Sequence, residues 1–243
     1  MTSRWPLELV IDPGRSQVAH EADASLDASG WSAGAPLALL AQPARSGAEA
    51  DGLFLPEGYE PTYAYPLLVW LSTVPVSPCE FERRMRAISE RNYLGVCIPV
   101  SPQSEPAEVA LQVQNVVCAV RRDYHIHSER IVLAATADGA GIALEVALRH
   151  PTWFGGVVAL GAPPTSRCLL AEANQLRGFR AFLGGHSGAD WSALKKTERL
   201  LWTAGLNVRL WQWMEGSRVP TNVWRELNHW LMAGIENEAT VWA

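Results

Sequence analysis

The sequence predicts an α/β fold in which a mostly parallel central sheet carries helices on both faces. Short apolar runs of strand length alternate along the chain with longer stretches of helical periodicity. The clearest unit spans residues 130–162, where a buried strand, a turn of small residues, an amphipathic helix and a second buried strand follow one another. Two parallel strands need a crossover of this kind.

The length and composition of the chain predict a single globular domain. The 243 residues are enough for one sizeable core, and 48% of them are hydrophobic against 19% charged. We expect an N-terminal antiparallel β extension and loop over residues 1–50, followed by the α/β domain over 51–243.

Within the second range, the expected elements alternate as a doubly wound sheet requires. The apolar runs predict strands over residues 65–71, 94–100, 130–136, 156–160, 179–183 and 207–213. The helical periodicity predicts helices over residues 80–91, 106–123, 192–204 and 221–232, and a further helix that follows the turn of small residues and stops before Pro151.

The charge pattern excludes several classes of partner from our expectations. The net charge is −5 and Lys and Arg are not clustered, so nucleic acid is not an expected partner. No run approaches the eighteen or so apolar residues of a membrane span, and the first residues lack the apolar stretch of a secretory signal, so we expect a cytoplasmic protein. The four cysteines have no CxxC spacing, and neither a metal site nor a cofactor is expected.

The turn at residues 135–139 reads Ala-Thr-Ala-Asp-Gly. With the strand before it and the helix after it, this segment resembles the nucleophile elbow of α/β-hydrolases of the esterase and phospholipase/carboxylesterase kind. In that family a serine stands at the centre of small-x-Ser-x-Gly, on a strained turn that exposes its oxygen. The resemblance implies the α/β-hydrolase fold, and it places Ala137 at the serine position.

A shift of one residue would instead place Asp138 at the centre, as in the dehalogenase branch of the fold. The strand side of the pattern aligns without a gap when Ala137 is central. On the helix side, the proline that commonly falls about fourteen residues after the family's nucleophile is matched by Pro151, fourteen residues after Ala137. Both sides favour Ala137.

The loop expected after the strand at residues 65–71 also departs from the family. Residues 52–72 resemble the entry to the esterase core, and active members continue into His-Gly, whose loop supplies one N–H of the oxyanion hole. Here the chain reads Ser72, Thr73, Val74 and Pro75. By resemblance, Ser72, Thr73 and Asp138 take the oxyanion-loop positions.

The positions of the acid and the base are altered as well. By resemblance the acid falls near His186 or Ser187, with Asp190 a few residues late as a possible substitute. The segment around residues 210–231 matches the family's pattern for the catalytic histidine, with Arg218 at the matching position. A guanidinium stays protonated in proteins, so Arg218 cannot accept a proton from a serine.

Asp138 has two expected roles if it is not a nucleophile. The residue stands where the helix begins, and Asp is favoured as an N-cap. Alternatively, its carboxylate pairs with Arg218 across the former site. In either role a carboxylate beside the oxyanion amides would repel developing negative charge.

Three functional hypotheses follow. The first is a catalytically inactive, esterase-like protein that binds a small-molecule ligand in the inherited pocket or a protein partner. The second is an active ester or thioester hydrolase in which Asp138 is the nucleophile, or in which His186 and Asp190 activate water. The third is an assembly subunit, such as a homo-oligomer, that uses the Trp-rich C-terminal quarter and the N-terminal extension as interfaces.

Overall fold

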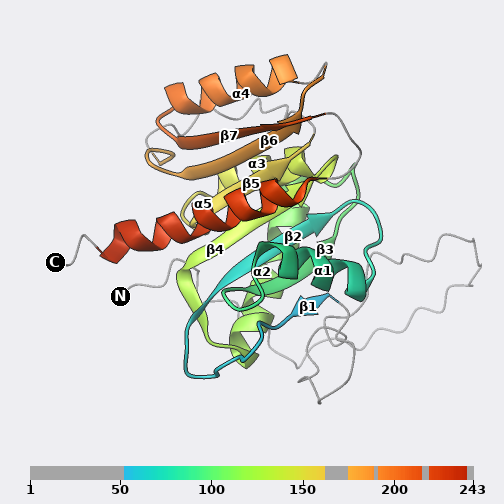
Figure 1. Ribbon diagram of the computed structural model, residues 1–243, viewed down its shortest axis with the longest axis vertical. Helices are drawn as coiled ribbons and strands as arrows, with labels where there is room; N and C mark the ends of the chain where they lie inside the picture. The colour runs from blue at the N-terminus through green and yellow to red at the C-terminus, as the bar shows by residue number, and fades with distance from the viewer. Residues whose placement is uncertain (1–51, 162–174, 189–190, 215–218, 240–243) are drawn as a thin grey trace, which may run out of the picture.

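The computed structural model describes residues 52–161, 175–188, 191–214 and 219–239, the last six of these by backbone alone. Figure 1 shows a single sheet with helices on both sides. Seven strands lie in the described part of the chain: β1 (Leu53–Phe54), β2 (Tyr65–Ser72), β3 (Leu94–Pro99), β4 (Ile126–Thr136), β5 (Gly156–Leu160), β6 (Arg180–His186) and β7 (Asn207–Trp213). The described helices are α1 (Pro78–Ile88), α2 (Pro106–Asp123), α3 (Gly139–Arg149), α4 (Trp191–Thr203) and α5 (Thr221–Ala239).

The seven strands form one sheet in the order β1-β3-β2-β4-β5-β6-β7. β1 is antiparallel to β3, and every other neighbouring pair is parallel. Because parallel strands share a direction, the carboxyl ends of β2 to β7 meet at one edge of the sheet and their amino ends meet at the other. The fold class predicted from the sequence is therefore confirmed. The antiparallel strand lies just after the expected extension, and residues 1–50 fall outside the described part.

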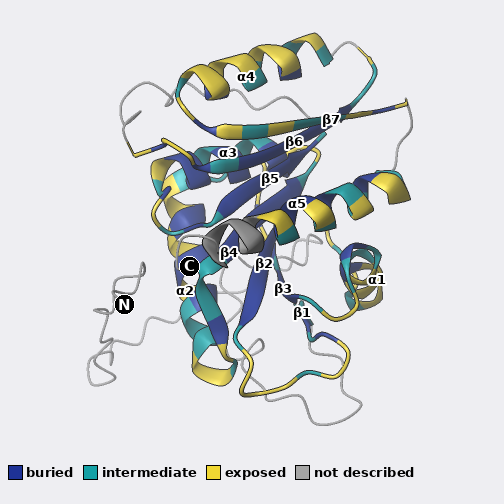
Figure 2. Cartoon of the chain, turned by 60° about the vertical axis from the view of Figure 1, so that its left-hand side comes forward, coloured by how far each residue is buried: buried dark blue, intermediate teal, exposed yellow. Residues whose placement is uncertain are grey.

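The two faces of the sheet are covered by different helices. Alternate residues of β4 divide between the faces: Ile131 and Leu133 belong to the core cluster beneath α2, α3 and α4, whereas Val132 belongs to the cluster beneath α1 and α5. In Figure 2 the central strands β2, β4 and β5 are mostly dark blue, whereas the edge strand β7 is largely yellow and teal. The central strands are thus buried on both faces, which is typical of a parallel sheet in an α/β protein.

Helix starts follow the local signals of the sequence. The hydroxyl of Ser77 accepts a hydrogen bond from the Glu80 amide at 3.2 Å, and Pro78 occupies the first turn of α1. Pro106 has the same place in α2. None of the described helices is both long enough and apolar enough to cross a membrane.

Several predicted boundaries differ from the structure, most of them by one to three residues, and the start of β4 and the end of α5 differ most. β4 begins at Ile126 rather than at residue 130, because the start of β2 pairs with it: Tyr65 faces Ile126, the Tyr65 amide donates to the His125 carbonyl, and the register then shifts before Leu67 faces Ile131. α5 continues to Ala239, past the expected end at residue 232.

Candidate functional site

The turn between β4 and α3 is held in an unusual backbone conformation. Ala137 has φ +50°, and it is the single non-glycine residue with positive φ in the described part of the chain. Its amide donates to the Leu160 carbonyl at 2.7 Å, and its carbonyl accepts from the Ala140 amide at 3.0 Å. L-residues other than Gly, Asn and Asp enter this region at a cost of about 1–2 kcal/mol, and such strain concentrates at functional sites.

Two glycines let neighbouring backbone approach this turn. A Cβ on Gly161, at the end of β5, would lie 2.9 Å from the nitrogen and 3.0 Å from the Cα of Ala137. A Cβ on Gly139 would lie 3.4 Å from the Leu71 carbonyl oxygen and 3.6 Å from the methyl carbon of Thr73. The turn is therefore packed between the ends of β2 and β5, with Ala137 itself exposed.

Asp138 follows Ala137 and is also exposed. Its backbone is already helical, with φ −62° and ψ −24°, and its side chain makes no capping hydrogen bond to α3. The expectation that Asp138 caps the helix through its carboxylate is wrong. A capping side chain reaches the amides of the first turn from an extended backbone, and Asp138 does not have one.

The residues after β2 form a short turn beside the elbow. Ser72 is buried, and its hydroxyl donates to the Val74 carbonyl at 2.7 Å. Thr73 is half-buried and is the residue whose methyl group faces Gly139. Ser72 and Thr73 therefore lie at the carboxyl edge of the sheet, beside the turn that holds Ala137.

His186 is the last residue of β6 and lies at the same edge. The Gly161 amide donates to the Gly184 carbonyl at 2.8 Å, which ties the end of β6 to the strand that contacts Ala137. The side chain of His186 folds over Gly188, where a Cβ would meet its ring atoms at 2.9 Å. Its Nδ1 is buried and has no hydrogen-bond partner among the described residues.

The remaining predicted site residues, Asp190 and Arg218, lie outside the described residues, as does any pairing between Arg218 and Asp138. Within the described ranges, no group of three His, Cys, Asp or Glu side chains is arranged to hold a metal ion. The described residues that gather at the carboxyl edge are Ala137, Asp138, Ser72, Thr73 and His186. Ala137 has a methyl group, which cannot act as a nucleophile.

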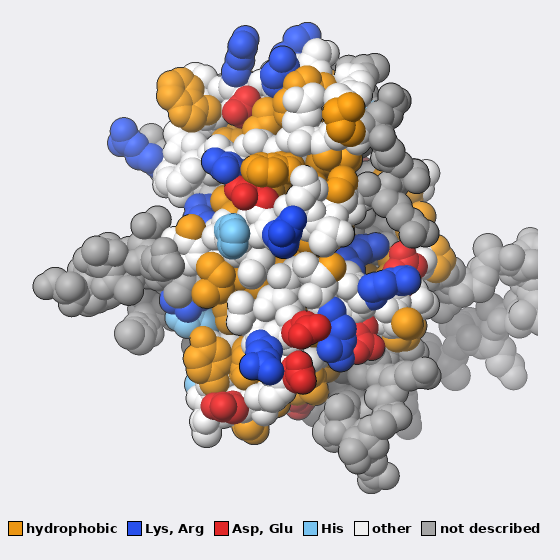
Figure 3. Space-filling view, in the orientation of Figure 1, with side chains coloured by type: hydrophobic (Ala, Val, Ile, Leu, Met, Phe, Trp, Pro, Cys, Tyr) orange, Lys and Arg blue, Asp and Glu red, His pale blue; other side chains and the backbone are white. Residues whose placement is uncertain are grey.

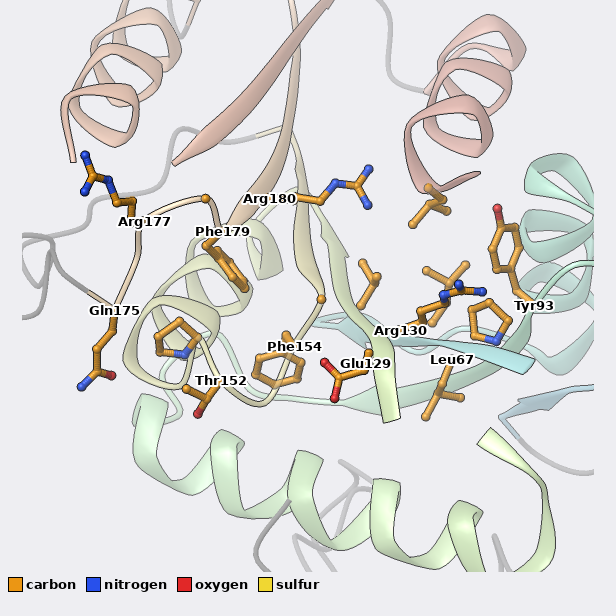
Figure 4. Close-up of a pocket in the computed structure, with 17 residues that line it drawn as sticks. Leu67, Tyr93, Glu129, Arg130, Thr152, Phe154, Gln175, Arg177, Phe179 and Arg180 are labelled. Carbon is orange, nitrogen blue, oxygen red and sulfur yellow. The ribbon is translucent and has the colours of Figure 1, made fainter. Parts of the chain in front are cut away.

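A cavity of about 420 Å³ lies at the opposite edge of the sheet, and the sequence analysis did not anticipate it. It is lined by residues at the amino ends of strands, including Leu67, Arg130 and Arg180, and by Leu231 of α5. Figure 4 shows these side chains around it. Along the sequence, the only feature that marks the cavity is a polar residue just before each of several apolar runs. The spacing of these residues does not show that they meet in space.

The C-terminal tryptophans serve mainly the core. Trp213 and Trp230 are buried, and Trp70 and Trp224 lie 5.9 Å apart between the sheet and α5. Trp202 of α4 is 72% exposed. Among the described tryptophans of the C-terminal quarter, Trp202 is the one that is strongly exposed.

Comparison with known proteins gives structural matches alone. No family model matches the sequence, and neither does any curated protein sequence. Among solved structures, a ferulic acid esterase has a TM-score of 0.58 at 13% identity, over 75% of this chain and 91% of its own. The carboxylesterase of Bacillus cereus has a TM-score of 0.56 at 15% identity, over 70% of this chain and 89% of its own.

A third match is a phospholipase/carboxylesterase from Dyadobacter fermentans, with a TM-score of 0.53 at 14% identity. The matched region spans 96% of that protein's length. The chain spans 57% of the length of a thermostable esterase that it also matches, with a TM-score of 0.51. At these identities the likeness establishes the fold and not the activity. The chain has the α/β-hydrolase fold, with the turn at Ala137 between its β4 and α3.

Proposed function

We propose that this protein is a catalytically inactive member of the esterase-like α/β-hydrolases and that it acts by binding rather than by hydrolysing esters. The observation that carries the proposal is Ala137 at φ +50° in the turn between β4 and α3. A strained strand-to-helix turn is where this fold exposes its nucleophile. In this chain the residue in that conformation has no atom that can attack a carbonyl.

The backbone geometry also bears on the choice between Ala137 and Asp138. Asp138 has ordinary helical angles, so it does not occupy the strained position. A carboxylate nucleophile at Asp138 would start from the first turn of α3 rather than from the apex of the turn. This supports the assignment of Ala137 to the nucleophile position, and it weighs against the alternative in which Asp138 attacks the ester.

The neighbouring groups support the same proposal. The hydroxyl of Ser72 is committed to the Val74 carbonyl, so it does not stand as a replacement nucleophile in this arrangement. Loss of the nucleophile or the base of a catalytic triad costs about 10⁶ in kcat where the triad acts as a unit. By resemblance Arg218 takes the position of the base, so a serine restored at 137 would lack the proton acceptor that the family uses.

The experiment is hydrolysis of a panel of short p-nitrophenyl esters by the purified chain, alongside the Asp138→Asn and His186→Ala variants. We expect all three proteins to give the same rate as buffer with an unrelated protein. A saturable rate that disappears in Asp138→Asn would contradict the proposal and identify a carboxylate nucleophile. A saturable rate that disappears in His186→Ala would also contradict it and would point to water activated by histidine.

A further inference from the structure

The cavity at the amino edge of the sheet is separate from the turn that holds Ala137. Val132, which lines the cavity, lies in β4 and precedes Ala137, just past the end of that strand, by five residues, or roughly 16 Å at the rise of a β-strand. Ligands of open α/β sheets normally bind outside the carboxyl ends of the strands. A ligand in this cavity would therefore occupy a site that is not inherited from the hydrolase active site.

The size and the walls of the cavity suit a small organic molecule. Its volume of about 420 Å³ lies within the range of about 300–1,000 Å³ that is usual for ligand pockets. Its apolar lining includes Phe179 and Leu231, which are 8% and 6% exposed, whereas Phe154 and Leu67 are closed off at 1% and 0%. The apolar surface open to the hydrocarbon part of a ligand therefore includes the edges of Phe179 and Leu231.

The charged groups of the described lining are mainly basic. Arg130, Arg177 and Arg180 line the cavity together with one carboxylate, Glu129. In Figure 4, Arg130 and Arg180 lie toward the side of Tyr93 and α5, whereas Phe154 and Phe179 lie on the other side and Arg177 points away from both. The cavity thus has a basic end and an aromatic end.

Arg180 and Tyr93 are fixed in place at the basic end. The Arg180 guanidinium lies 4.3 Å from the centre of the Trp230 ring and donates to the Trp230 carbonyl. The Tyr93 hydroxyl donates to Oδ1 of Asn228 at 2.8 Å. Burial raises the pKa of Tyr93 and the charge of Arg180 opposes this rise, which places the guanidinium within electrostatic reach of the phenol. Groups that are already ordered lose little entropy when a ligand binds.

We propose that this cavity binds a small organic monoanion, whose carboxylate lies between Arg130 and Arg180 and whose hydrocarbon part extends toward Phe179. Arginine is suited to this role because its planar fork matches a carboxylate and it keeps its charge. The Glu129 carboxylate in the same lining disfavours ligands with several negative charges, so nucleotides and other polyanions fit less well.

Surface charge outside the cavity gives no comparable site on the face seen in Figure 3. There the acidic and basic side chains of the described residues are interspersed, with apolar side chains between them. A mixed surface of this kind does not concentrate an anion.

The test is calorimetric titration of the full chain with benzoate, phenylacetate and 2-naphthoate, and with 2-naphthamide as a neutral match for 2-naphthoate. We expect 2-naphthoate to bind at least about tenfold more tightly than 2-naphthamide, since a hydrogen bond to a charged group contributes about 1.5–3 kcal/mol. Arg130→Gln should weaken 2-naphthoate by about tenfold or more and change the affinity for 2-naphthamide by less than about twofold. A large side chain at the exposed rim, in Thr152→Trp, should weaken both ligands.

Two control variants locate the site. Arg86→Gln removes a surface guanidinium of α1 that pairs with Glu82, and it should leave every affinity unchanged. Asp138→Asn removes a negative charge beside Ala137 and should also leave 2-naphthoate unchanged, whereas a probe bound at the carboxyl edge would gain affinity. Circular dichroism and thermal melting of each variant establish that it is folded, and Arg130→Lys provides a second variant that keeps the charge if Arg130→Gln does not fold.

The proposal would be overturned if none of the three carboxylates binds, if 2-naphthoate and 2-naphthamide bind equally, or if Arg130→Gln and Arg86→Gln weaken binding alike. These outcomes are independent of ester hydrolysis. A failure here leaves the proposal for Ala137 unaffected, and an active esterase would leave this cavity unaffected.

Discussion

Gly161 lies directly against the backbone of Ala137, so that a Cβ added to Gly161 would stand 2.9 Å from the nitrogen of Ala137 and 3.0 Å from its Cα. Side chains essentially never approach backbone atoms this closely, and backbone cannot move aside as a flexible side chain can. The φ of +114° at Gly161 adds a second reason for glycine. The end of β5 therefore holds Ala137 in its strained conformation.

Gly161→Ala should destabilise the protein by more than backbone conformation alone explains. We expect a loss of about 2–4 kcal/mol, from the contact with Ala137 together with the positive φ. Gly58→Ala is the matched control because Gly58 also has positive φ, at +72°, but has nothing within 4 Å of an added Cβ. Urea unfolding of both variants measures the difference, and equal losses would show that the contact with Ala137 contributes nothing.

Ala137→Gly should be neutral or stabilising. Glycine removes a strain of about 1–2 kcal/mol at φ +50° and costs about 0.5–1 kcal/mol of additional chain entropy, so the net change lies between zero and a gain of about 1.5 kcal/mol. Ala140→Gly, three residues later in the buried first turn of α3, should lose about 1 kcal/mol or more. If chemical denaturation gives the same loss for both variants, Ala137 is not strained.

Ala137→Ser should place a hydroxyl at the apex of the turn without restoring ester hydrolysis. A serine hydroxyl attacks only when a base accepts its proton, and by resemblance the position of the base is taken by Arg218. Hydrolysis of p-nitrophenyl acetate by Ala137→Ser should equal that of the wild type and of Ala137→Gly. A gain of a hundredfold or more in the serine variant alone would mean that a base is present.

The thiol of Cys97 should make the stability of the protein fall in alkaline solution. Burial raises its pKa from 9.0 to about 11, against the opposing charge of Arg84. Between pH 9 and 11 the unfolded chain loses this proton while the folded chain keeps it, so the unfolded state binds fewer protons and the free energy of unfolding falls as the pH rises. The slope for one group is at most about 1.4 kcal/mol per pH unit.

Cys97→Val isolates this contribution, and Cys79→Ser, at an exposed thiol, is its control. Between pH 9 and 10 we expect the free energy of unfolding to fall by about 1 kcal/mol less in Cys97→Val than in the wild type, and by an unchanged amount in Cys79→Ser. Tyr93, whose pKa burial also raises, from 10.0, contributes mainly above this window, and its contribution is the same in all three proteins. Identical pH profiles for all three proteins would show that Cys97 is not protected by burial.

Local sequence signals were sufficient for most of the fold. The bounds of α2, β5 and β7 agree with those expected, because a proline starts α2 and because short apolar runs bounded by turn residues define the two strands. The start of β4 could not be read locally: residues 126–129 include polar side chains and join the strand because Tyr65 pairs with Ile126 from a distant part of the chain. The end of α5 was placed too early since no glycine or proline stop signal marks its true end.

The candidate site was predictable where it depends on spacing along the chain, as at Ala137, fourteen residues before Pro151. The role of Asp138 was not predictable, because it depends on backbone angles. Aspartate is favoured as a helix N-cap, but the backbone of Asp138 is helical and its side chain makes no capping hydrogen bond. The cavity was missed because its lining comes from distant parts of the sequence: Tyr93 precedes β3, Arg130 lies within β4 and Arg180 begins β6. They meet only through the order of the strands in the sheet.

The most direct test of the central claim is a single-turnover measurement with the wild-type chain in excess over p-nitrophenyl acetate. Excess protein reveals an attack by any group, even if the product never leaves. We expect p-nitrophenol to be released at the rate seen with the same protein unfolded in urea, after correction for the effect of urea on the background. Release that is faster and that saturates with protein concentration would contradict the claim that Ala137 leaves this α/β-hydrolase fold without ester chemistry.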